Sequence, residues 1–64
     1  STQQRIVSFI SKAGRSVSVQ EVAEGIGDAE SCEVVFKIVR HLAANERLEI
    51  EHGASIFDDR YVCP

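Results

Sequence analysis

The sequence predicts a single small α+β domain in which three helices are followed by a β-hairpin. Apolar residues recur at helical spacing as far as about Asn45. From Leu48 onward they alternate with polar residues, which is the pattern of a half-buried strand. The chain has 64 residues, of which 44% are hydrophobic, and this length suffices for one domain with a core near the lower size limit.

The first helix is predicted over residues 2–13 because four apolar side chains fall on one of its faces. These are Ile6, Phe9, Ile10 and Ala13. Gly14 follows the last of them, where a left-handed helix end favours glycine. The β-branched stretch at residues 16–19 is long enough for a stub of strand only.

The second helix is predicted over residues 19–25. Ser18 and Glu21 are three residues apart and form a capping box, in which each side chain satisfies a backbone amide of the other. Gly25 and Gly27 are predicted to end this helix. A short helix that is followed at once by another helical start indicates a helix-turn-helix.

The third helix is predicted to run to about Asn45, with Asp28 or Ser31 as its cap. Asp28, Glu30 and Glu33 lie near its amino end, where negative charge is favourable to the helix dipole. Its predicted buried stripe consists of Val34, Val35, Ile38, Val39 and Leu42.

The predicted hairpin begins with a strand that contains Leu48 and Ile50. Residues 52–55 form the turn, in which Gly53 supplies the unusual dihedral angles. The second strand is predicted over residues 56–62, and the two strands are expected to pair antiparallel.

This order of elements resembles the winged-helix superfamily over essentially the whole chain. The resemblance implies a winged helix-turn-helix, with three helices, a short strand stub and a C-terminal β-hairpin wing. Members of the superfamily bind duplex DNA through the third helix, and many dock proteins instead. The fold alone does not decide between these functions.

A shorter resemblance is to the C-terminal winged helix of the middle subunit of replication protein A, a protein-docking module. It is carried by Asp58-Asp59-Arg60-Tyr61 and by residues 42–46. The resemblance implies an acidic docking strand that includes Asp58, Asp59 and Tyr61. The hairpin is longer here than in that family. The winged-helix ends of replicative helicase subunits look similar as well.

A face of the third helix is predicted to point to solvent when the core direction is set between Val35, Ile38 and Leu42. It carries Glu33, Phe36, Lys37, Arg40 and Ala44, with His41 on the flank. Lys37, Arg40 and His41 are therefore the candidate nucleic-acid contacts, because cations can reach phosphates or a guanine edge. The alternative is a solvated face in which Glu33 and Lys37 form an i,i+4 pair.

Phe36 allows two interpretations. Either the helix is rotated or the wing folds over the aromatic ring, or else the exposed ring anchors a partner protein.

The charge balance predicts at most weak duplex binding by a monomer. The chain contains seven basic and ten acidic residues, and its net charge is −3. Residues 48–64 hold four acidic residues against Arg60 alone, and the wing has no Lys or Arg to contact phosphates.

Several other classes of protein are excluded or disfavoured. No apolar run approaches the roughly 18 residues that a membrane span needs, and no signal segment begins the chain. The two cysteines fit a reducing intracellular compartment, cytoplasmic or nuclear, although one disulfide between them is an alternative. The absence of Met suggests a piece of a larger protein.

No catalysis, cofactor or metal is expected. The four candidate soft ligands lack the spacing of a zinc site. They are Cys32, His41, His52 and Cys63. The first functional hypothesis is thus a DNA-associated module that binds nucleic acid weakly through the third helix. The alternative is a docking module that binds a basic partner in a replication, repair or transcription assembly through Phe36 and the acidic hairpin, and a third possibility is self-association through Phe36.

Overall fold

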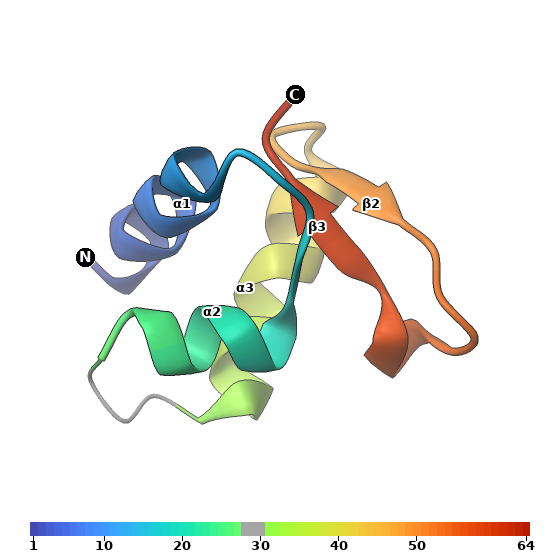
Figure 1. Cartoon of the computed structure of the whole chain (residues 1–64), viewed down its shortest axis with the longest axis horizontal. Helices are drawn as coiled ribbons and strands as arrows, with labels where there is room; N and C mark the ends of the chain where they lie inside the picture. Colours follow the sequence, from blue (N-terminus) through green and yellow to red (C-terminus); the bar gives the residue numbers. More distant parts are fainter. Residues whose placement is uncertain (28–30) are drawn as a thin grey trace.

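The structure is a computed structural model that describes residues 1–27 and 31–64. Its helices are α1 (Thr2–Ala13), α2 (Val19–Gly25) and α3 (Cys32–Ala44). Its strands are β1 (Val17–Ser18), β2 (Glu49–Glu51) and β3 (Arg60–Val62), and a 3-10 turn, η1 (Ile56–Asp58), precedes β3. In the view of Figure 1, α1 and α2 lie to the left of the sheet, and the long β2–β3 connection loops out on the opposite side before η1 leads back into β3. The predicted small α+β domain is confirmed.

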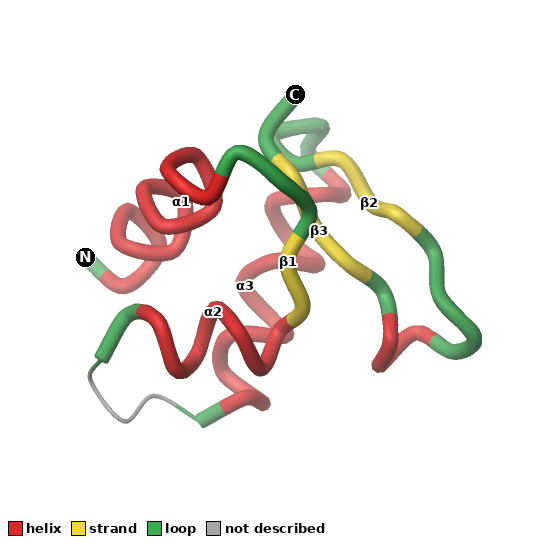
Figure 2. The backbone as a smooth tube through the Cα atoms, in the orientation of Figure 1, coloured by secondary structure: helices red, strands yellow, loops and turns green. Residues whose placement is uncertain are grey.

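The sheet has three antiparallel strands in the order β1-β3-β2. Tyr61 in β3 is opposite Val17 of β1 on one side and Ile50 of β2 on the other. The predicted antiparallel pairing of the last two strands is therefore confirmed, and the strand stub proves to be the second neighbour of β3 (Figure 2). The predicted short turn is wrong, because residues 52–59 separate the two strands and Gly53 does not have a positive φ.

The prediction that the last strand begins at residue 56 is wrong. Residues 56–58 form η1 instead, because the Ser55 side chain accepts a hydrogen bond from the Phe57 amide and the Ser55 carbonyl accepts one from the Asp58 amide at 2.9 Å. The ladder with β1 and β2 starts only at Arg60.

The helix ends follow the capping rules. Ser18 and Glu21 form the predicted capping box, and Gly14 ends α1 with φ +65°. Ser31 is the cap of α3 and accepts from the Val34 amide at 3.2 Å. Ser1 also forms a capping box, which the sequence analysis missed. The predicted roles of Asp28 and Glu30 lie outside the described residues.

The core is formed by one apolar cluster between the three helices and the sheet. It consists of Ile6, Ile10, Val17, Val19, Val22, Ala23, Val35, Val39, Leu42, Leu48 and Tyr61. In α3 the buried side is centred on Val35, Val39 and Leu42, so the helix is rotated slightly from the predicted direction. As a result Ile38 is only half-buried, and Val34, predicted to be in the core, is 39% exposed.

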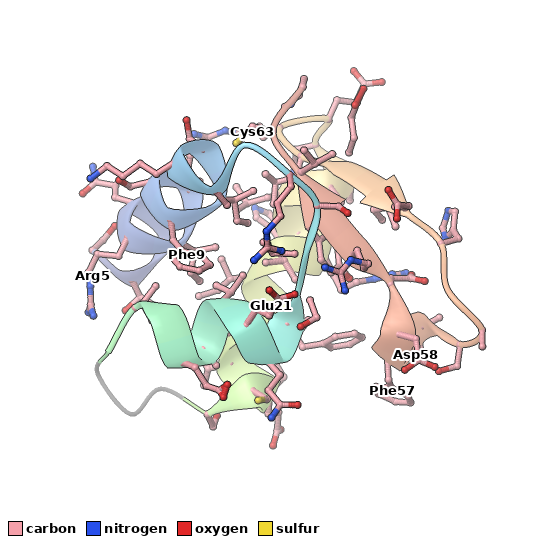
Figure 3. All side chains as sticks on the ribbon, viewed as in Figure 1. Arg5, Phe9, Glu21, Phe57, Asp58 and Cys63 are labelled. Carbon is pink, nitrogen blue, oxygen red and sulfur yellow. The ribbon has the colours of Figure 1, made fainter. Side chains whose placement is uncertain are left out.

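Helices α1 and α2 approach each other at Gly25. A Cβ atom at this position would lie 2.2 Å from Cε2 of Phe9, whose ring comes from α1 and points towards α2 (Figure 3). Gly25 is the last residue inside α2, so its role is this close approach as well as helix termination. The Arg5 side chain donates a hydrogen bond to the Ile26 carbonyl and joins the same two helices.

Both cysteines are free thiols, with Cys32 exposed and Cys63 half-buried. Within residues 1–27 and 31–64, no helix has the length and apolar character that crossing a membrane requires.

Candidate functional site

An ionic cluster around Asp59 connects α3 to the β2–β3 connection. The Asp59 side chain is only 2% exposed, and its Oδ2 accepts from Arg40 of α3 at 2.8 Å. Its Oδ1 accepts from the Gly53 amide at 2.9 Å, and His52 Nδ1 lies 3.5 Å from Oδ2. A buried carboxylate is tolerated only when it is paired and hydrogen-bonded in this way.

The electrostatics of this cluster stabilise both charges. The hydrogen bond from the Gly53 amide lowers the pKa of Asp59, and the Arg40 and His52 charges lower it further against the opposing effect of burial. The buried Tyr61 hydroxyl has no hydrogen-bond partner in the part of the chain that the structure describes.

The acidic docking strand that the resemblance implied is not present as a surface. Asp59 is buried against Arg40, and Tyr61 is completely buried in the core, so neither can contact a partner in this structure. Only Asp58 is exposed, and its carboxylate accepts from the Ser55 hydroxyl at 3.2 Å (Figure 3).

The three candidate nucleic-acid contacts do not form one cationic face. Lys37 is 75% exposed and pairs with Glu33 at 3.7 Å. Arg40 is directed to Asp59, so its charge is neutralised within the fold. His41 is exposed near the end of α3, where the Asn45 side chain donates to its carbonyl at 2.8 Å.

Phe36 is half-buried because the β2–β3 connection reaches its ring. The centroids of Phe36 and Phe57 are 5.6 Å apart with a tilt of 31°. The Arg40 guanidinium lies 5.8 Å from the Phe36 centroid, within cation–π range. The half-buried state of Phe36 thus agrees with the interpretation in which the helix is rotated or the hairpin connection covers the ring.

Phe57 is the surface residue that the sequence analysis missed. It is 73% exposed, and its neighbour Ile56 is exposed as well. The sequence does contain a pattern that could have indicated this exposure, because two adjacent large apolar residues lie between the polar turn and two aspartates. Both residues were predicted to lie in the second strand of the hairpin and thus to pair with the first.

A pocket of about 370 Å³ lies beside these rings, where the first turns of α2 and α3 meet η1. We call it the aromatic pocket, and its lining residues are Val19, Gln20, Cys32, Glu33, Phe36 and Phe57. A second hollow of about 240 Å³ lies over the α1–α2 contact and is lined by Arg5, Ser8, Phe9, Lys12, Gly25 and Ile26.

A second ionic cluster is centred on Glu21. Glu21 accepts from Arg15 at 2.8 Å and from Arg60 at 3.0 Å, while it also caps α2. The hydrogen bond from Arg15 is the main reason that the pKa of Glu21 falls to about 2, and the Ser18 amide adds to it. Arg60 also donates to the Ser16 carbonyl, so this cluster joins β3 to β1 and α2. Among the described residues, no three His, Cys, Asp or Glu side chains are grouped so that they could hold a metal ion.

The chain is similar to a segment of several glucose-6-phosphate isomerases. The chain is 40% identical over 51 residues to the glucose-6-phosphate isomerase of Trichormus variabilis, 47% over 47 residues to that of Rippkaea orientalis, and 34% over 59 residues to that of Synechococcus elongatus. These matches cover 80%, 73% and 92% of the chain. No protein-family model and no solved structure matches it.

The chain spans only about a tenth of the length of the curated relatives it matches. The similarity therefore concerns a segment of those enzymes rather than a whole isomerase.

The predicted function in DNA replication, repair or transcription is wrong. The relatives are named for an isomerase of a sugar phosphate, and none of those described is named for DNA binding or for transcription. The structure supplies a physical reason for the error, because Arg40, the central cation of the predicted DNA-binding face, belongs to an internal ion pair. The acidic docking surface of the alternative hypothesis is mostly buried.

Proposed function

We propose that the chain is a non-catalytic module of a glucose-6-phosphate isomerase-like protein. The observation that carries the proposal is the extent of the matches. They take in 70–92% of this chain at 34–47% identity, and only 9–10% of each relative. A segment of that size can be one folded unit within a much larger enzyme.

The use of the ionisable side chains supports a structural role. A general acid or base has to face the bound substrate with a free proton site. Asp59 is instead saturated by Arg40 and the Gly53 amide, and Glu21 by two arginines and a helix cap. These two clusters connect strands to helices, which is what a stable small module requires.

The arrangement of the module is, in our proposal, that of a winged helix-turn-helix. The order α1-β1-α2-α3-β2-β3 and the position of β3 between β1 and β2 support it. In this proposal the β2–β3 connection with η1 is the wing. The module keeps this arrangement without any nucleic-acid function.

A segment exchange tests the proposal. In the Synechococcus elongatus enzyme, the 59 residues that match this chain would be replaced by the matching residues of this chain. We expect the chimera to fold and to keep isomerase activity within about threefold of the parent, because homologous modules with the same core remain compatible with their surroundings. A Gly/Ser segment of equal length is the control and should lower the melting temperature of the enzyme.

Two results would contradict the proposal. One is a chimera that is unfolded or no more stable than the Gly/Ser control, since the segment would then not be an equivalent unit. The other is measurable isomerase activity of the isolated chain, which would exclude a non-catalytic role.

A further inference from the structure

The aromatic pocket has a wall that the fold leaves largely uncovered. Phe57 forms this wall and is 73% exposed, although its ring contacts Phe36 at a centroid distance of 5.6 Å. Ile56 next to it is exposed too. Single exposed apolar residues are common on proteins, but two adjacent ones beside a hollow of about 370 Å³ are typical of an interface. An aromatic side chain at the centre of such a patch is the usual anchor.

One carboxylate, that of Glu33, lines the pocket, and a second, that of the exposed Asp58, belongs to the residue next to Phe57. Lys37 compensates Glu33 only across 3.7 Å between two highly exposed side chains, which is a weak pair. Arg40 contributes little net charge because it is paired with Asp59. The complementary surface therefore combines an apolar side chain with a Lys or Arg.

A second copy of this chain is a poor complement. In a twofold contact each copy would present the same patch, so that the Glu33 and Asp58 carboxylates of both copies would enter one interface. Like charges placed opposite each other oppose association. The rest of an isomerase, which makes up about nine tenths of the relatives' length, need not present an acidic surface to this patch.

We propose that the aromatic pocket is the docking site of this module on the catalytic part of a glucose-6-phosphate isomerase. An apolar side chain of that part occupies the pocket against Phe57, and a cation of that part faces Glu33. This inference rests on the proposed function. It adds to it the surface through which the module is held.

Cys32 gives a direct measurement of pocket occupancy. Its thiol is exposed in this structure and lines the pocket. The rate at which a maleimide modifies Cys32 would be measured by mass spectrometry in the isolated chain and in the chimera described above. We expect modification to be at least about tenfold slower in the chimera, because a docked side chain excludes the reagent.

Three substitutions then assign the protection to the pocket, with each variant of the chimera compared to the same variant of the isolated chain. Phe57→Ser should reduce the protection to less than about threefold, since the anchor is lost. Glu33→Lys should also reduce it by reversing the charge at the rim. Val34→Ser is the matched control, because Val34 is an exposed apolar residue of α3 that does not line the pocket. It should leave the protection unchanged.

The outcomes separate this inference from the proposed function. An active, folded chimera in which Cys32 reacts as fast as in the isolated chain overturns the docking site and leaves the module assignment intact. A chimera that does not fold removes the module assignment and the docking site with it. Protection of Cys32 that rises with the concentration of the isolated chain, and that Phe57→Ser abolishes, would replace the isomerase surface by a second copy as the occupant.

Discussion

The contact between Gly25 and Phe9 predicts that Gly25→Ala destabilises the domain, against the usual behaviour of this substitution. In an exposed helix, replacing Gly by Ala stabilises by about 1 kcal/mol. Here the new Cβ atom would lie 2.2 Å, 2.5 Å and 2.8 Å from three ring carbons of Phe9. Ordinary carbon–carbon contacts are about 3.5 Å or longer, so the ring would have to retreat by about 1.3 Å.

The expected magnitude follows from these opposing effects. Overpacking of this kind costs about 1–3 kcal/mol, because the displaced ring loses its own contacts in the core. Subtracting the gain in helix propensity leaves a net loss of up to about 2 kcal/mol in the free energy of unfolding. Urea denaturation followed by circular dichroism measures this difference, provided that the slope of the transition is unchanged.

A double-mutant cycle with Phe9→Leu tests the reasoning. Leucine lacks the outer ring carbons that approach Gly25, so Gly25→Ala should become neutral or stabilising in that background. Gly14→Ala is the control, since it has a positive φ of 65° with no atom within 4 Å of a new Cβ. Its loss should be independent of Phe9. If Gly25→Ala stabilises the unaltered protein, the close approach of α1 and α2 is not as described.

Three further predictions concern the polar groups of the core and of the two ionic clusters. The folded protein holds the pKa of Glu21 at about 2, below its ordinary 4.5. The stability that this carboxylate contributes is therefore complete above about pH 4.5 and is lost as the pH falls towards 2. Glu21→Gln should flatten the pH dependence of the melting temperature in that interval, and an unchanged slope would contradict this prediction. Asp59→Asn should lower the melting temperature at pH 7, because it leaves Arg40 without its partner charge. It should also accelerate hydrogen exchange of the Gly53 amide, because the acceptor of this amide is weakened. Exchange at the original rate would show that this hydrogen bond is not made in solution. Tyr61→Phe should raise the free energy of unfolding by about 1 kcal/mol in a urea titration, since the buried hydroxyl has no hydrogen-bond partner among the described residues. A decrease of similar size in the free energy of unfolding would show that the hydroxyl does have a partner.

The sequence predicted the helices well because their signals are local. Capping boxes, apolar spacing and glycine positions act within a few residues, and α1 and α2 begin and end where these signals place them. The pairing of the hairpin strands was also predictable, because alternation fixes which side of a strand faces the core.

The pairs that shape the surface could not be predicted because they are distant in sequence. Arg40 and Asp59 are 19 positions apart, and each looked like an exposed charge until the fold brought them together. The same holds for Phe36, whose exposure depends on where Phe57 comes to lie. The functional hypothesis failed for this reason, since it relied on side chains that the fold uses internally.

The place of β3 in the middle of the sheet also sets the order in which the domain can be completed. Neither β1 nor β2 has a neighbouring strand until Arg60–Val62 is available, and Tyr61 fills the centre of the core only at that point. The helices are built from nearby contacts and can form early, whereas closing the sheet joins residues 44 positions apart. During synthesis, nearly all of these residues would therefore have to leave the ribosome before the core can be completed. Proteolysis just before Arg60 would remove the pairing partner of both β1 and β2.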